Sequence, residues 1–188
     1  MPQNTSRGYT YPTYQDPANF PAQIQDLAQD IDLDMEDLWD RVVAGNNQPA
    51  CHVVASLVNQ PIAVNTDVNA TFTTEVYDND NMVNLGADST LVTLTETGIY
   101  IATGRSTFLS NGNATINSRQ LVLLTNGPNL TVGRKSLQGD QNVATAVQLT
   151  VIFYANAGNT LRMPQRQNSG ASLNSSTRTL QVAKVSSL

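Results

Sequence analysis

The spacing of apolar residues along the chain changes near residue 50. Before that point they recur every three or four positions, as on one face of a helix: Ile24, Leu27, Ile31, Met35, Leu38 and Val42. From Cys51 onward apolar and polar residues alternate, which is typical of strands with one buried face. The pattern predicts one helical segment followed by a β domain.

The helical pattern predicts a helix over residues 21–44. Pro21 suits the first helical position, and Gly45 with the two asparagines after it supplies a stop. The step from Ile24 to Met35 spans an eleven-residue repeat of three turns, and ~3.67 residues per turn is nearly the period of a straight helix. We therefore expect an oligomerisation stem of nearly straight parallel helices. The alternative is a helix that packs on the sheet of its own domain.

Nine runs predict short strands: Cys51–Leu57, Ala70–Tyr77, Thr90–Thr95, Gly98–Phe108, Arg119–Thr125, Leu130–Gly133, Ala144–Tyr154, Asn159–Pro164 and Thr177–Val185. Segments rich in Asn, Gly and Asp separate them, and no helical pattern interrupts them. The fold class predicted is mainly β, an antiparallel sandwich or jelly roll behind a helical stem. The organisation is an extended arm (1–20), a stem (21–44), a linker (45–50) and a head (51–188).

The longest run, Ala144–Tyr154, separates two faces. Thr145, Val147, Leu149, Val151 and Phe153 form a clear core face, since alternate residues of a strand share one side. The other face mixes polar residues with Ile152 and Tyr154. Such a face is expected to contact water or another subunit.

Composition and charge exclude several functions. Only 13% of residues are charged, and eight of the fifteen acidic residues fall in residues 1–50, beside two arginines. The head is therefore nearly neutral and lacks the basic surface that nucleic-acid binding needs. We expect no membrane insertion, because no apolar run reaches ~18 residues, and no secretory leader opens the chain. Cys51 is the only cysteine, so no disulfide forms within one chain.

Catalytic and cofactor chemistry has little basis in this sequence. His52, the only histidine, adjoins Cys51, but neighbouring strand residues point to opposite faces. The acidic turn at Asp78 and Asp80 is interpreted as an Asx-rich turn rather than a calcium site. Glu75 and Glu96, the only glutamates of the head, are interpreted as surface residues rather than a glycosidase pair. We expect no enzyme, no cofactor and no metal.

The β region carries a recurring set of positions. Gly98 and Tyr100 enter a central strand, Asn126-Gly127 ends another, and Gly158-Asn159 precedes a late strand. In these positions residues 51–188 resemble the jelly-roll superfamily of tumour necrosis factor and the complement globular heads. Asn159 departs from the usual Asp. The resemblance implies a trimeric recognition head.

The N-terminal segment carries a second resemblance. The strings Gly8–Pro12 and Asp16–Pro21, followed by Ile24–Asp32, resemble the opening of small tail proteins of actinobacterial phages. This implies a virion component attached by its arm, where aromatic side chains would contact other virion proteins: Tyr9, Tyr11, Tyr14 and Phe20.

Together these patterns predict a virion structural protein that trimerises and binds a host-surface glycan or cell-wall polymer. It would be a short tail fibre, a tail tip or a capsid-decorating spike. The candidate contact loops are Ser110–Asn113 and Gln167–Ser176, which include Asn111, Asn113, Asn168 and Asn174. Two alternatives stay open, a secreted jelly-roll signalling or recognition ligand and a surface-acting glycan hydrolase.

Overall fold

The computed structural model describes residues 3–4, 10–11, 25–36, 38, 48–110, 118–126, 130–140 and 142–186. The chain divides into two compact units, Met1–Asn47 and Gln48–Leu188. Each unit is described by itself below.

In the first unit, residues 25–36 and 38 are helical. Strands β1 (Gln3–Asn4) and β2 (Thr10–Tyr11) pair antiparallel. Of the predicted stripe, Leu27 is half-buried, while Ile31, Met35 and Leu38 are exposed. The stripe's two end residues and three aromatics of the arm lie outside the described residues: Ile24, Val42, Tyr9, Tyr14 and Phe20. An exposed apolar helix face in a single chain is compatible with a stem, whose role stays a prediction.

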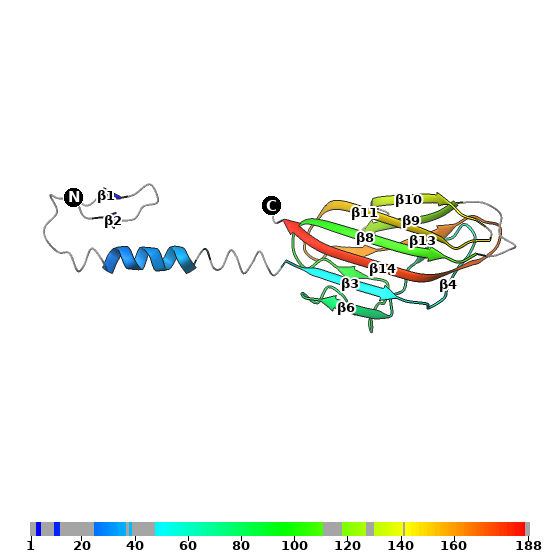
Figure 1. Ribbon diagram of the computed structural model, residues 1–188, viewed down its shortest axis with the longest axis horizontal. Helices are drawn as coiled ribbons and strands as arrows, with labels where there is room; N and C mark the ends of the chain where they lie inside the picture. The colour runs from blue at the N-terminus through cyan, green and yellow to red at the C-terminus, as the bar shows by residue number, and fades with distance from the viewer. Residues whose placement is uncertain are drawn as a thin grey trace. The chain divides into compact units, whose positions relative to one another are not determined.

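The second unit, called the head, is a sandwich of two antiparallel sheets (Figure 1). Sheet one has the order β11-β8-β14-β3-β6, with β4 paired to β14, and sheet two has the order β5-β13-β9-β12-β7, with β10 paired to β9. The strands are β3 (Ala50–Ala55), β4 (Gln60–Ile62), β5 (Val68–Asn69), β6 (Thr74–Asp78), β7 (Val92–Thr93), β8 (Gly98–Phe108), β9 (Ser118–Thr125), β10 (Leu130–Gln138), β11 (Thr145–Ala155), β12 (Thr160–Arg162), β13 (Pro164–Gln167) and β14 (Leu173–Ser186). The mainly β, jelly-roll fold class predicted for the head is confirmed.

The core lies between the sheets and follows from the alternation along each strand. Strand β8 alternates between buried and more exposed residues along its whole length, and its buried members include Tyr100, Ala102 and Phe108. In β11, Val147 is fully buried, and Leu149, Val151 and Phe153 pack against the core. The predicted core face of that strand is therefore confirmed.

The sequence pattern did not predict β4, β5 and β13 as separate strands, because each is only two to four residues long. Strand β10 is longer than the predicted run, reaching Gln138 across a register shift between Thr131 and Gly133. At Gly133 an added Cβ would collide with Val151 of β11, so only glycine fits this close approach between strands.

The chain enters and leaves the head at one end. Ala50, the first residue of β3, is paired with Ala183 near the end of β14, and the Lys184 amide donates to the Pro49 carbonyl at 2.8 Å. We call this end the base. The opposite end, called the distal end, carries the turn at residues 56–59 and residues 109–110, 139–140, 142–144 and 168–172, which follow or precede the strands there.

Candidate functional site

The outward side of sheet one is the most distinctive surface of the head. Along β11, β8, β14 and β3, the positions that alternate with core residues carry a single permanent charge, Arg105. We call this surface the outer face. Its members are Ala146, Gln148, Thr150, Ile152 and Tyr154 of β11, Ile99, Ile101, Thr103, Arg105 and Thr107 of β8, Thr179, Gln181, Ala183 and Val185 of β14, and Ala50, His52 and Val54 of β3.

Strand register arranges the outer face in rows. One row runs Thr150, Thr103, Gln181, His52 and Tyr77, across all five strands from β11 to β6. The next runs Ile152, Ile101, Ala183 and Ala50. Cross-strand partners on one side of a sheet lie close enough to form a continuous surface. The outer face is thus one apolar and amide-bearing patch rather than scattered residues.

Several large apolar side chains of the outer face are exposed to solvent. Ile152 is 70% exposed, Tyr154 52% and Val185 54%. The edge strand β6 adds Val76 and Tyr77, also exposed. Contiguous exposed apolar surface ringed by polar groups commonly marks an interaction site.

A shallow groove of about 260 Å³ lies within the outer face, lined by Tyr77, Ile101, Thr103, Gln181, Val182 and Ala183. His52 adjoins it, and its ring meets the Tyr77 ring edge-on with centroids 5.8 Å apart. The groove is smaller than the ~300–1,000 Å³ of typical small-molecule sites. Its size suits one inserted side chain better than a cofactor.

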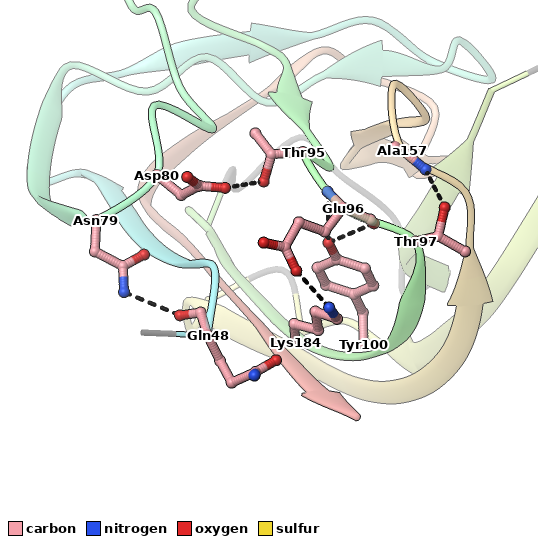
Figure 2. A network of polar contacts seen from close by, with 9 residues as sticks. All are labelled: Gln48, Asn79, Asp80, Thr95, Glu96, Thr97, Tyr100, Ala157 and Lys184. Atoms are coloured by element: carbon pink, nitrogen blue, oxygen red, sulfur yellow. Dashed lines mark hydrogen bonds and ion pairs between the residues drawn. The ribbon is translucent and has the colours of Figure 1, made fainter. Parts of the chain in front are cut away.

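A network of polar contacts lies at the base of the head (Figure 2). The Lys184 amine, whose side chain is only 4% exposed, forms an ion pair with the Glu96 carboxylate. The Tyr100 hydroxyl donates to the Glu96 carbonyl at 2.8 Å. An added Cβ at Gly98 would lie 2.6 Å from the Lys184 Cε atom, so the Gly-x-Tyr pattern leaves room for this buried lysine. The network is structural, because it fixes the last strand against the start of β8.

The Glu96–Lys184 pair yields a stability prediction. Glu96→Gln leaves a buried ammonium without its counter-charge, so we expect the free energy of unfolding to fall by about 2–4 kcal/mol. Denaturant titration of the full chain measures this. Glu96→Gln combined with Lys184→Met should recover part of the loss. If the double variant is no more stable than the single one, the buried charge is not the cause.

The carboxylates of the acidic turn after β6 accept hydrogen bonds from nearby groups of the same chain. The Asp78 carboxylate accepts the amides of Asp80, Met82 and Val83 at 2.8–3.2 Å, and Asp80 accepts the Thr95 hydroxyl. This is the pattern of an Asx-rich turn. Among the described residues, no group of three or more histidine, cysteine, aspartate or glutamate side chains gathers as metal ligands would.

Cys51 and His52 lie on opposite sides of β3, as predicted. Cys51 is fully buried in the core, whereas His52 is half-buried on the outer face. Burial, with smaller contributions from Asp78 and Glu75, raises the pKa of the Cys51 thiol to about 12. The thiol therefore stays protonated and inert at neutral pH.

That burial predicts slow chemical labelling. We expect Cys51 to resist a maleimide or disulfide reagent in the folded protein and to react fully after denaturation, because the thiolate is both unpopulated and shielded. Mass spectrometry over time measures the modified fraction. Rapid labelling without loss of folded signal would contradict the buried position.

At the distal end, described residues on either side of segment 111–117 contact segment 168–174. The Leu109 amide donates to the Asn174 carbonyl at 2.7 Å, and Asn168 accepts the Ser118 amide at 2.8 Å. The residues that flank segment 111–117 are therefore tied to segment 168–174. Asn111 and Asn113 themselves lie outside the described residues.

Part of the segment Gln167–Ser176 is not a surface loop. Asn174 is exposed but lies in β14, paired with Pro61 of β4, a strand the sequence did not reveal. Gln167 and Ser169 are fully buried, and the Gln167 amide donates to the Ile62 and Ala171 carbonyls. Buried amides with satisfied hydrogen bonds make this end of the head rigid.

Arg178 anchors the same end. Its guanidinium is fully buried and donates to the carbonyls of Thr71 (3.1 Å), Val58 (2.8 Å) and Ser175 (2.8 Å). Burial lowers its pKa from the usual arginine range. One buried cation thus joins the 56–59 turn, the segment before β6 and the start of β14. No sequence pattern distinguished this arginine from a surface one.

Comparison with known proteins bears on the fold. The globular domain of a zebrafish complement 1qA protein aligns with 12% identity and a TM-score of 0.55, over 74% of this chain and 99% of that domain. Murine APRIL aligns with 15% identity and a TM-score of 0.55, over 73% and 99%. The Eiger TNF of S. frugiperda aligns with 11% identity and a TM-score of 0.53, over 76% and 95%. No protein-family model and no curated protein matches the sequence.

The head is therefore a jelly roll of the kind seen in tumour-necrosis-factor-like and complement C1q-like domains. At 11–15% identity this likeness concerns the fold. Among the described residues, no helix is long and apolar enough to cross a bilayer.

Proposed function

We propose that this protein is a homotrimeric, non-enzymatic recognition protein whose heads associate through the outer face. The observation that carries the proposal is the outer face itself, where Ile152, Tyr154 and Ile101 stand on a surface with one permanent charge. Covering it with a second copy removes apolar area from water at about 25 cal/mol per Å² and leaves few charges to desolvate. The jelly-roll likeness supports the same arrangement.

The stem adds to the assembly in this proposal. Ile31, Met35 and Leu38 are exposed in the single chain, and parallel packing of three helices would cover them. Joining three heads on one stem raises the effective concentration of the remaining binding sites once one head has bound the target surface. Weak contacts at three distal ends then act together.

The finer assignment is a virion protein whose N-terminal arm attaches it to other virion proteins. It rests on the resemblance of residues 8–44 to the opening of small phage tail proteins. Within the head, the base receives the chain and the distal end lies opposite, which suits outward presentation of Asn168 and Asn174 to a host-surface glycan or wall polymer. Deleting residues 1–20 should abolish incorporation into particles, whereas normal incorporation would contradict this assignment.

The central experiment is the mass of the full chain in solution. Light scattering at micromolar concentration should give three times the mass of one chain. A single-chain mass would overturn the proposal.

A further inference from the structure

Within the described part of the chain, no side chain fills the groove on the outer face. Its lining combines the apolar side chains of Ile101 and Ala183, the polar side chains of Thr103 and Gln181, and the Tyr77 ring, which the His52 ring contacts edge-on. A lining with both apolar and polar side chains suits an occupant that is mostly apolar and ends in one hydroxyl. Tyrosine has this combination.

Tyr154 has the matching chemistry and an exposed position. It stands on the edge strand β11, 52% exposed, and its hydroxyl contacts the Asn156 side chain at 2.8 Å. Ile152, two residues earlier, is 70% exposed on the same face. These two residues form a projecting apolar ridge at the edge of the outer face.

The ridge adjoins the groove at Ile101, the β8 partner of Ile152, but most of the groove lining belongs to strands farther from β11. Strand β14 is the second strand from β11, and β6 is the fourth. At ~4.8 Å between strands, Tyr154 is displaced ~10 Å from Ala183 and ~19 Å from Tyr77. The Tyr154 ring does not line the groove of its own chain: Tyr154 pairs with Ile99 of β8, and its hydroxyl donates to the Asn156 side chain.

We propose that Tyr154 of a neighbouring copy occupies this groove. The inference rests on the proposed function and specifies its contact. Each copy offers its ridge to one neighbour and its groove to another, so the contact is heterologous and closes as a ring. The partner copy thus contributes the residue that completes the site.

A photoreactive residue of similar shape tests the contact. Tyr154→p-azidophenylalanine in the full chain, illuminated after assembly, should link to peptides containing Tyr77, Ile101–Thr103 or Gln181–Ala183. Because each copy both gives and receives one link, a covalent trimer should appear on a denaturing gel. Links to other peptides, or no links, would overturn the groove assignment. Covalent dimers as the end product, even at exhaustive illumination, would overturn the ring.

Filling the groove separates this inference from the trimer itself. Ala183→Trp should raise the dissociation constant at least tenfold, while Ala87→Trp, at an exposed turn position between β6 and β7 and outside the outer face, should leave it unchanged. A trimer of unaltered affinity with Ala183→Trp would overturn the groove contact and leave the trimer standing. A wild-type chain that runs alone would instead defeat the proposed function.

Discussion

Replacing Arg178 with methionine is expected to lower the free energy of unfolding by about 3–5 kcal/mol, the largest loss of stability among the substitutions considered. The guanidinium donates to three carbonyls from three segments of the distal end. Methionine matches much of its apolar length but supplies no donor. Each buried carbonyl left without a partner costs about 1–3 kcal/mol, which outweighs the relief of burying one fewer cation.

Denaturant titration of the full chain measures this loss, with Arg134→Met as the matched control. Arg134 lies on β10 and is exposed, so its replacement should change stability by no more than about 0.5 kcal/mol. Arg178→Lys should fall between the two, because one ammonium cannot reach all three carbonyls. If Arg178→Met is as stable as Arg134→Met, the guanidinium is not the anchor described above.

Ile152→Asp is expected to convert the proposed trimer to single chains. The side chain is 70% exposed in one copy and sits in register with Ile101, at the β11 end of the apolar row. Covering a carboxylate there without a partner costs several kcal/mol per contact. Since 1.4 kcal/mol is tenfold in affinity, the dissociation constant should rise by more than ~100-fold. Light scattering across a concentration series measures it.

Leu57→Asp is the control for this substitution. Leu57 is more exposed still, at 84%, but it lies in the distal turn off the outer face, and its positive φ of 57° suits aspartate better than leucine. It should leave the trimer intact. Equal disruption by both variants would indicate a general effect of added charge rather than a contact at Ile152.

The long strands were predictable from sequence because their inward residues are consistently apolar. The predicted run Gly98–Phe108 matches β8 residue for residue, and the alternation in β11 placed Val147 and Tyr154 on the correct sides. The pairing of His52 with Gln181 and Tyr77 could not be predicted from the sequence, because the register between strands distant in sequence depends on the whole sheet.

The short strands and the polar interior escaped prediction for a different reason. β13 is Pro-Gln-Arg-Gln, and Gln165 and Gln167 are buried only because Ser106, Gln60 and the Ile62 carbonyl supply their partners. Glutamine normally favours the surface, so the residue types of β13 indicated an exposed segment rather than a buried one. The groove, likewise, arises from residues of β6, β8 and β14 that no local pattern connects.

The pairing of Ala50 with Ala183 also has a practical consequence for protein engineering. Because the head's polypeptide begins and finishes at neighbouring points, the whole sandwich can be spliced into a surface turn of a carrier protein through two short spacers. A reporter fused after β14 would likewise lie at the base. The distal end would then stay free to bind a ligand. Display vectors built on this scaffold should therefore randomise the exposed 56–59 turn, keep the buried Ser169 unchanged, and place their tags after the last strand.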